Sequence, residues 1–166
     1  MTLNTAAPET PAVDCYQRLA QMGLTLHKPP SPIGNFVNHT RIGNLMYLSG
    51  QGPSTSEGIL HTGKVGLDVT AEQAYAHARL TGINLISVLH EELNDLNRVV
   101  KIVKLLGMVN ASPDFSAHPS VINGCSDLMV EVFGPRIGMH ARSAVGMGSL
   151  PNNITVEIEA IIEIQP

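Results

Sequence analysis

The stretch RVVKIVKLLGMVN, residues 98–110, decides the fold class of this chain. It is rich in β-branched and other aliphatic residues, and only Lys101 and Lys104 interrupt the apolar character of its two alternating faces. Such a run predicts a strand that is buried on two sides, at the centre of a sheet. The other segments of the chain must therefore supply cover for both faces of that strand.

Amphipathic helices are predicted on either side of this strand. Residues 68–93 contain a long helix, with Thr70 and Gln73 spaced as a capping box. Residues 118–134 predict a second helix, in which Gly124 is a weak point because glycine has a low helix propensity. The apolar residues that the spacing turns toward the core are Ala74, Ala78, Ile83, Ile86 and Leu89 in the first helix, and Val121, Ile122, Cys125, Met129 and Phe133 in the second.

Further strands are predicted before the first helix and after the second. They cover residues 36–42 and 45–50, around the turn pair Gly43-Asn44, and residues 141–149 and 154–164, joined by residues 150–153. The order ββαβαββ predicts an α+β fold, a mixed sheet that carries two long helices on one face. One chain supplies too few helices to cover the other face, which predicts self-association through it.

The chain is expected to divide into an N-terminal extension, residues 1–30, and a single domain, residues 31–166. Within the extension, residues 11–23 predict a short amphipathic helix. Residues 27–36 are rich in proline and residues 52–66 in glycine, so both are predicted to be irregular.

The composition argues against several classes of protein. The chain has 166 residues and a net charge of −4, and its ten lysines and arginines are scattered, so we expect no nucleic-acid partner. The seven histidines and two cysteines show no metal-ligand spacing, so we expect no metal and no other cofactor. The first residues do not resemble a leader, and no apolar run is long enough to span a bilayer. A cytoplasmic protein that does not bind membranes is therefore expected.

A lone arginine precedes a run of small residues near the end of the chain. On a strand, Arg142 shares one face with Ala144, Gly146 and Gly148. Glycine weakens a strand and marks a place where a ligand or another chain approaches the backbone closely. Because a guanidinium pairs bidentately with carboxylates, Arg142 is a candidate for binding a carboxylate ligand.

Arg142 also has a structural interpretation. If residues 150–153 form a four-residue hairpin connection, Arg142 lies on the same face as Glu157 and Glu159 and can form a salt bridge with either of them. It could equally brace the end of a helix. In an alternating strand, at least one of the two glutamates is expected to be an ordinary solvated or inter-subunit carboxylate.

Two motifs together resemble one known family. RSAVGMGSLPNNITVEIEAI, residues 142–161, and GNLMYLSGQGP, residues 43–53, resemble the Rid (YjgF-like) family of reactive-intermediate deaminases, and the likeness runs in order from about Pro32 to Ile164. The resemblance implies a chorismate-mutase-like fold that forms homotrimers. In such trimers the sheets wrap into a central barrel and leave three ligand clefts between subunits.

The resemblance also implies roles for individual residues. Arg142 would bind the substrate carboxylate, and Glu157, fifteen residues later, would orient a water molecule. Gly50 would border the ligand through its backbone, and Asn123 would line the cleft, although a helix-surface amide is the alternative for Asn123.

Two positions depart from the pattern of active family members. Phe36 stands where these members carry an aromatic hydroxyl, and Ala144 stands where they carry a cysteine. Phe36 has a simple packing role as its alternative. Residues 134–141 form an insert near the expected cleft, in which Arg136 and His140 are candidates for reshaping it.

The first functional hypothesis is a cofactor-free hydrolysis of small imines or enamines derived from amino acids, which releases ammonium and a 2-oxo acid. The second is a non-catalytic trimeric module that binds small carboxylate metabolites in the same cleft, and the departures at Phe36 and Ala144 keep it open. The third, RNA cleavage, is disfavoured by the acidic chain.

Overall fold

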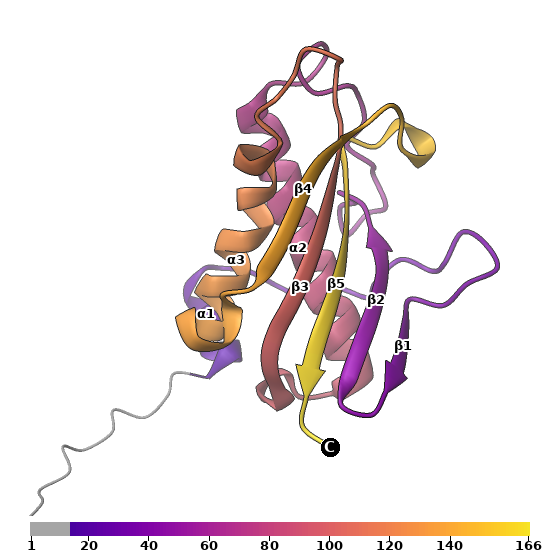
Figure 1. Cartoon of the computed structure of the whole chain (residues 1–166). Coiled ribbons are helices and arrows are strands. Elements are labelled where there is room, and N and C mark those ends of the chain that lie inside the picture. The colour runs from indigo at the N-terminus through magenta and orange to yellow at the C-terminus, as the bar shows by residue number, and fades with distance from the viewer. Residues whose placement is uncertain (1–13) are drawn as a thin grey trace, which may run out of the picture.

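The computed structural model describes residues 14–166 as two layers, a five-stranded sheet and the helices that cover one of its faces (Figure 1). The strands are β1 (His39–Ile42), β2 (Leu45–Gln51), β3 (Val99–Asn110), β4 (Ala141–Met147) and β5 (Val156–Ile164). The helices are α1 (Cys15–Gln21), α2 (Ala71–Leu93), η1 (Leu96–Arg98), α3 (His118–Gly138) and η2 (Pro151–Asn153). This order confirms the predicted α+β fold. Among residues 14–166, no helix is long and apolar enough to cross a membrane.

The strand order across the sheet is β1-β2-β5-β3-β4. All neighbours are antiparallel except β3 and β4, which run parallel because α3 forms the crossover between them. The predicted two-residue turn Gly43-Asn44 joins β1 to β2, with Ile42 opposite Leu45. The interpretation of residues 150–153 as a hairpin connection is wrong. β3 lies between β4 and β5, so the segment that joins β4 to β5 must cross the end of β3.

The core lies between the sheet and the two long helices. Thr70 and Gln73 form the predicted capping box at the start of α2. The residues of α2 and α3 predicted to face inward are buried, except Ile83, which is half-buried against the rim of the core. The residues of β5 on this face are also buried: Val156, Ile158, Ala160, Ile162 and Ile164.

Gly124 has a different role from the one predicted. A Cβ atom at this position would overlap the carbonyl oxygen of Tyr75 on α2. On the facing helix, a Cβ atom at Gly82 would lie only 2.9 Å from a Leu128 methyl and 3.2 Å from the Cys125 sulfur. The low helix propensity of Gly124 describes α3 in isolation, whereas in the fold this glycine permits α2 and α3 to approach each other.

The opposite face of the sheet has no covering layer among the described residues, and Figure 1 shows all three α-helices on the other side. Val103, Leu106 and Met108 of β3 are half-buried, although β3 was predicted to be covered on both faces. The lysines of β3 lie in its first half, and Lys104 donates a hydrogen bond to Ser143 Oγ at 2.9 Å. The cover that the sequence predicted for this face is therefore not provided by a single chain.

The N-terminal helix is shorter than predicted and is docked on the core. Asp14 caps α1 by accepting a hydrogen bond from the Tyr16 amide, and residues 11–13 of the predicted helix lie outside the described part of the chain. The Tyr16 hydroxyl lies 3.0 Å from His90 Nδ1 of α2 and accepts a hydrogen bond from the Leu96 amide at 3.0 Å. After the proline-rich segment, β1 begins at His39 rather than at residue 36.

We expect Gly124→Ala to lower the free energy of unfolding by at least about 1–3 kcal/mol, although alanine has the better helix propensity. The added methyl group meets backbone of α2, which cannot rotate away as a flexible side chain could. Urea unfolding followed by circular dichroism measures the change. Gly148→Ala is the control, because nothing lies within 4 Å of a Cβ atom at that position. Equal unfolding midpoints for the two variants would contradict the close helix contact.

Candidate functional site

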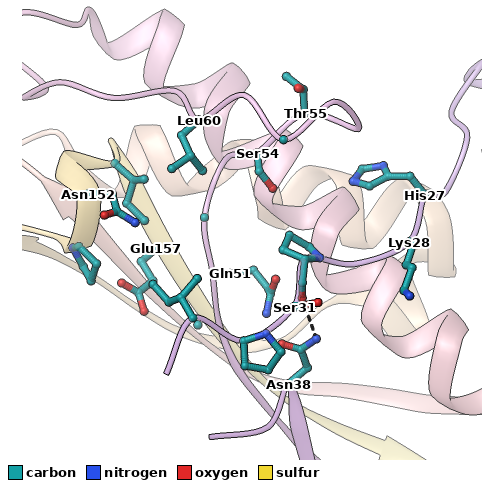
Figure 2. A pocket seen from close by; sticks show the side chains of 18 of the residues that line it. His27, Lys28, Ser31, Asn38, Gln51, Ser54, Thr55, Leu60, Asn152 and Glu157 are labelled. Atoms are coloured by element: carbon teal, nitrogen blue, oxygen red, sulfur yellow. Dashed lines mark hydrogen bonds between the residues drawn. The ribbon is translucent and has the colours of Figure 1, made fainter. Parts of the chain in front are cut away.

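A cavity of about 510 Å³ opens beside the start of β5. The proline-rich segment that follows residue 27 and the loop that follows β2 form two of its walls, and η2 and β5 form a third. Figure 2 shows Glu157 and Asn152 on one side of the opening and His27 on the other. Apolar walls with a few polar groups are typical of sites for small molecules.

Glu157 is the carboxylate of this cavity. It is half-buried, and it alternates along β5 with the buried Val156 and Ile158, so it lies on the face of the sheet that the helices leave open. Burial raises the pKa of its carboxyl group, and the negative charge of Glu159 raises that pKa further. A carboxyl group with a raised pKa binds its proton more tightly than an ordinary glutamate does, which favours a role in proton transfer.

Gly50, which the resemblance predicted to border the ligand, lines the cavity and lies directly against Glu157. A Cβ atom at Gly50 would overlap the carboxyl oxygen of Glu157. Gly50 sits in a β-bulge of β2, because the register with β5 shifts between Leu48 and Gln51. The bulge and the absence of a side chain at Gly50 together leave room for the Glu157 carboxyl group beside the backbone of β2.

Phe36 and Asn152 also line the cavity. Phe36 is 48% exposed, so it is a residue of the cavity wall and not of the core, and it brings no hydroxyl group. Asn152, which the sequence analysis did not single out, adopts a left-handed conformation with φ of 52° within η2. The signal that could have identified it is the Pro-Asn-Asn turn immediately before β5.

Arg142 lies elsewhere, at the start of β4, and its side chain contacts α3. Its Nη1 donates hydrogen bonds to Asn123 Oδ1 at 2.8 Å and to Ser126 Oγ at 3.0 Å, and its Nη2 donates to the carbonyl of Pro119 at 3.4 Å. The structure therefore brings together Arg142 and Asn123, two of the residues to which the resemblance assigned roles in the cleft. Ser126 was missed, although its spacing of three residues from Asn123 places both on one face of the helix.

The small residues that follow Arg142 are partly explained by α3. Ala144 is half-buried and packs against the core, and a Cβ atom at Gly146 would overlap the ring of His118. At Gly146, the close approach that glycine permits is therefore made by the same chain and not by a ligand. Gly148, in contrast, faces open space.

Arg142 and Glu157 lie on opposite faces of the sheet. Arg142 is in register with Leu105, which is buried under the helices, whereas Glu157 is in register with Met108 on the open face. The salt bridge considered between Arg142 and Glu157 or Glu159 is therefore wrong for a single chain. Each chain instead carries one group with Arg142 and Asn123, and another with Glu157, Gly50 and Phe36.

The insert lies at the end of α3 that is far from the cavity. Residues 135–138 add a turn to α3 after Gly134, and the Arg136 carbonyl accepts a hydrogen bond from Lys101 Nζ at 2.8 Å. His140 reaches Ser126 Oγ with its Nε2 at 3.0 Å, so it belongs to the Arg142 group. Within residues 14–166, no three His, Cys, Asp or Glu side chains lie close enough to hold a metal ion.

Comparisons with known proteins identify the family and the fold of the chain. Residues 16–163 match the family described as "YjgF/chorismate_mutase-like, putative endoribonuclease". Protein TCP17 of Trypanosoma cruzi is 38% identical over 88% of this chain and 91% of its own length. A 2-iminobutanoate/2-iminopropanoate deaminase of Dermatophagoides farinae is 32% identical over 82% of this chain and 91% of its own length. The crystal structure of Atu1372 from Agrobacterium tumefaciens, of unknown function, has a TM-score of 0.83 and 43% identity, with 91% of this chain and 94% of that chain covered.

We expect Glu157→Gln to stabilise the folded protein at neutral pH and to leave its stability unchanged in acid. Because the pKa of Glu157 is raised by folding, the folded state binds the proton more tightly than the unfolded state. The free energy of unfolding of the wild type therefore falls as the pH rises from the ordinary glutamate pKa through the raised one, and glutamine lacks this fall.

Urea unfolding at a series of pH values measures this difference. Glu57→Gln is the control, because it removes the same charge from an exposed loop position. Stability curves that stay parallel for the wild type and Glu157→Gln across the whole range would show that folding does not perturb this carboxyl group.

Proposed function

The chain belongs to the Rid (YjgF-like) family, and from this membership we propose that it hydrolyses small imines or enamines derived from amino acids. The products are ammonium and a 2-oxo acid, and no cofactor takes part. The observation that carries the proposal is the half-buried Glu157 carboxyl group, which faces a cavity and has a raised pKa. The relative from Dermatophagoides farinae, named as a deaminase of this type, supports the same reaction.

The reaction requires little from the protein beyond proximity and proton transfer. A water oxygen forms a bond to the imine carbon, and the nitrogen gains a proton. The resulting carbinolamine then breaks its C–N bond, forms a carbonyl and releases ammonia, which is protonated in solution. Glu157 would orient the water and exchange the protons, and holding both reactants together supplies much of the rate increase.

Arg142 would bind the substrate carboxylate, and this assignment requires a second copy of the chain. Arg142 and Glu157 lie on opposite faces of one sheet, so a site that uses both has to combine Arg142 of one copy with Glu157 of another. The uncovered sheet face, with Val103, Leu106 and Met108 half-buried, supports self-association. We therefore place the reaction in clefts between the subunits of a homotrimer.

The first test generates an amino-acid imine in situ and follows its disappearance with and without the protein. We expect acceleration by the wild type and a loss of at least about tenfold in kcat/KM for Arg142→Ala, because a charge-assisted bidentate pair is removed. Arg142→Lys should restore little, since an ammonium cannot present two parallel donors. Arg41→Ala, on the exposed strand β1, is the matched control.

If 2-oxo acids bind saturably but the imine is lost no faster with the protein, the enzyme hypothesis is rejected in favour of the non-catalytic carboxylate-binding module. Unchanged affinity in Arg142→Ala would remove Arg142 from the site. If Arg142→Ala instead lost thermal stability or its oligomeric state before it lost affinity, its role would be structural.

The second test asks whether two chains share a site. Light scattering should give three times the chain mass of 17.7 kDa. Arg142→Ala and Glu157→Gln should each lose most activity, and co-expression of the two should restore about a quarter of it, because random mixing pairs the two intact groups at about one interface in four. A stable monomer at micromolar concentration, or mixed oligomers as inactive as the single variants, would contradict the shared cleft.

A further inference from the structure

We propose that Ser126 and His140 are positioning residues for Arg142, which hold one end of its guanidinium against α3 so that the other edge is presented to the ligand carboxylate. This inference rests on the proposed function, in which Arg142 binds that carboxylate. It assigns a role to the insert, residues 134–141, because His140 is part of it.

The hydrogen-bond directions in this group allow a single consistent network. His140 Nδ1 lies 2.6 Å from the Gly138 carbonyl oxygen, which can only accept, so Nδ1 carries a proton. In a neutral imidazole Nε2 is then an acceptor, and the Ser126 hydroxyl donates to it across 3.0 Å. The lone pairs of Ser126 Oγ are thereby turned toward Arg142, whose Nη1 donates to them at 3.0 Å.

The surroundings of His140 favour that neutral form. Burial lowers the pKa of its imidazole, and the positive charges of Arg142 and Lys101 lower it further, against the opposing hydrogen bond to Gly138. A neutral ring keeps Nε2 free to accept. The Ser126 hydroxyl therefore keeps one orientation and serves Arg142 as an acceptor.

Some hydrogen-bond donors of Arg142 are used within the chain, and the others are available to a ligand. Both N–H groups of Nη1 are used, by Asn123 Oδ1 and Ser126 Oγ, and one N–H of Nη2 is used by the Pro119 carbonyl. Within the described part of the chain, Nε–H and the second N–H of Nη2 have no acceptor. Nε and Nη2 form the edge of the guanidinium that can pair side-on with a carboxylate.

The insert is folded so that His140 returns to Ser126. Gly134 has a φ of 77°, which breaks α3, and Pro135 begins its last turn. A Cβ atom at Gly138 would overlap the Met129 carbonyl oxygen, so this turn packs against the earlier turns of the same helix. Met139 is extended, and the chain reverses to place His140 beside Ser126. His140 contacts Ser126, and Ser126 contacts Arg142, so both act through Arg142.

The test compares Ser126→Ala and His140→Phe with the wild type in the imine assay and in inhibition by 2-oxobutanoate and by its carboxamide. Each variant should raise KM and the inhibition constant of the carboxylate about two- to tenfold, as expected for one hydrogen bond, with kcat unchanged. Binding of the carboxamide should not change, because it forms no ion pair with Arg142. Ser126→Thr and His140→Gln, which retain a hydroxyl and an acceptor, should recover most of the loss.

Ser120→Ala on the exposed side of α3 is the matched control and should behave as the wild type. If Ser126→Ala and His140→Phe keep the wild-type KM while Arg142→Ala loses affinity, the positioning role is overturned and the proposed function stands. If the carboxamide weakens as much as the carboxylate, the two residues are structural and the inference is also overturned. If Arg142→Ala itself keeps its affinity, Arg142 is not part of the site and this inference fails, whereas the proposed function fails only if the wild type does not accelerate the loss of the imine.

Discussion

The pairing of β3 with both β4 and β5 is the constraint on which the rest of the structure depends. β3 lies parallel to β4 and antiparallel to β5, so it forms the middle of the sheet and separates the two C-terminal strands. Because side chains alternate between faces, the registers of Leu105 and Met108 send Arg142 toward the helices and Glu157 toward the open face. Because of this pairing, the candidate site is distributed over the two faces of the sheet.

Neither of the two ionisable groups has a counter-ion among residues 14–166. Arg142 contacts only neutral acceptors, and the pKa of Glu157 is raised by burial and by a like charge. The ion pairs within residues 14–166, Arg79–Glu131 and, when the histidine is protonated, His39–Glu92, involve neither of them. A cation with spare donors and a carboxyl group with a raised pKa are features expected of a site that binds an anionic ligand and transfers protons.

The elements that depend on local patterns could be predicted from the sequence. The Gly43-Asn44 turn, the Thr70 capping box and the alternation along β5 each follow from a few neighbouring residues. Contacts between distant segments could not be predicted: no local pattern places β3 between β4 and β5, α2 against Gly124, or His118 against Gly146. The Arg142 group was therefore predicted only in part, because its contact with His140 depends on a chain reversal at a broken helix end.

The same geometry limits what the departures at Phe36 and Ala144 change. Ala144 faces α3 and packs against the core, so a cysteine thiol in its place would point away from the cavity of its own chain. Phe36 lines the cavity, and its missing hydroxyl removes one hydrogen-bonding group from that wall. The Glu157 carboxyl group and the Nε/Nη2 edge of Arg142 do not depend on either position. The departure at Phe36 therefore changes one wall of the cavity, the departure at Ala144 changes packing against α3, and the groups that the proposed hydrolysis uses are retained.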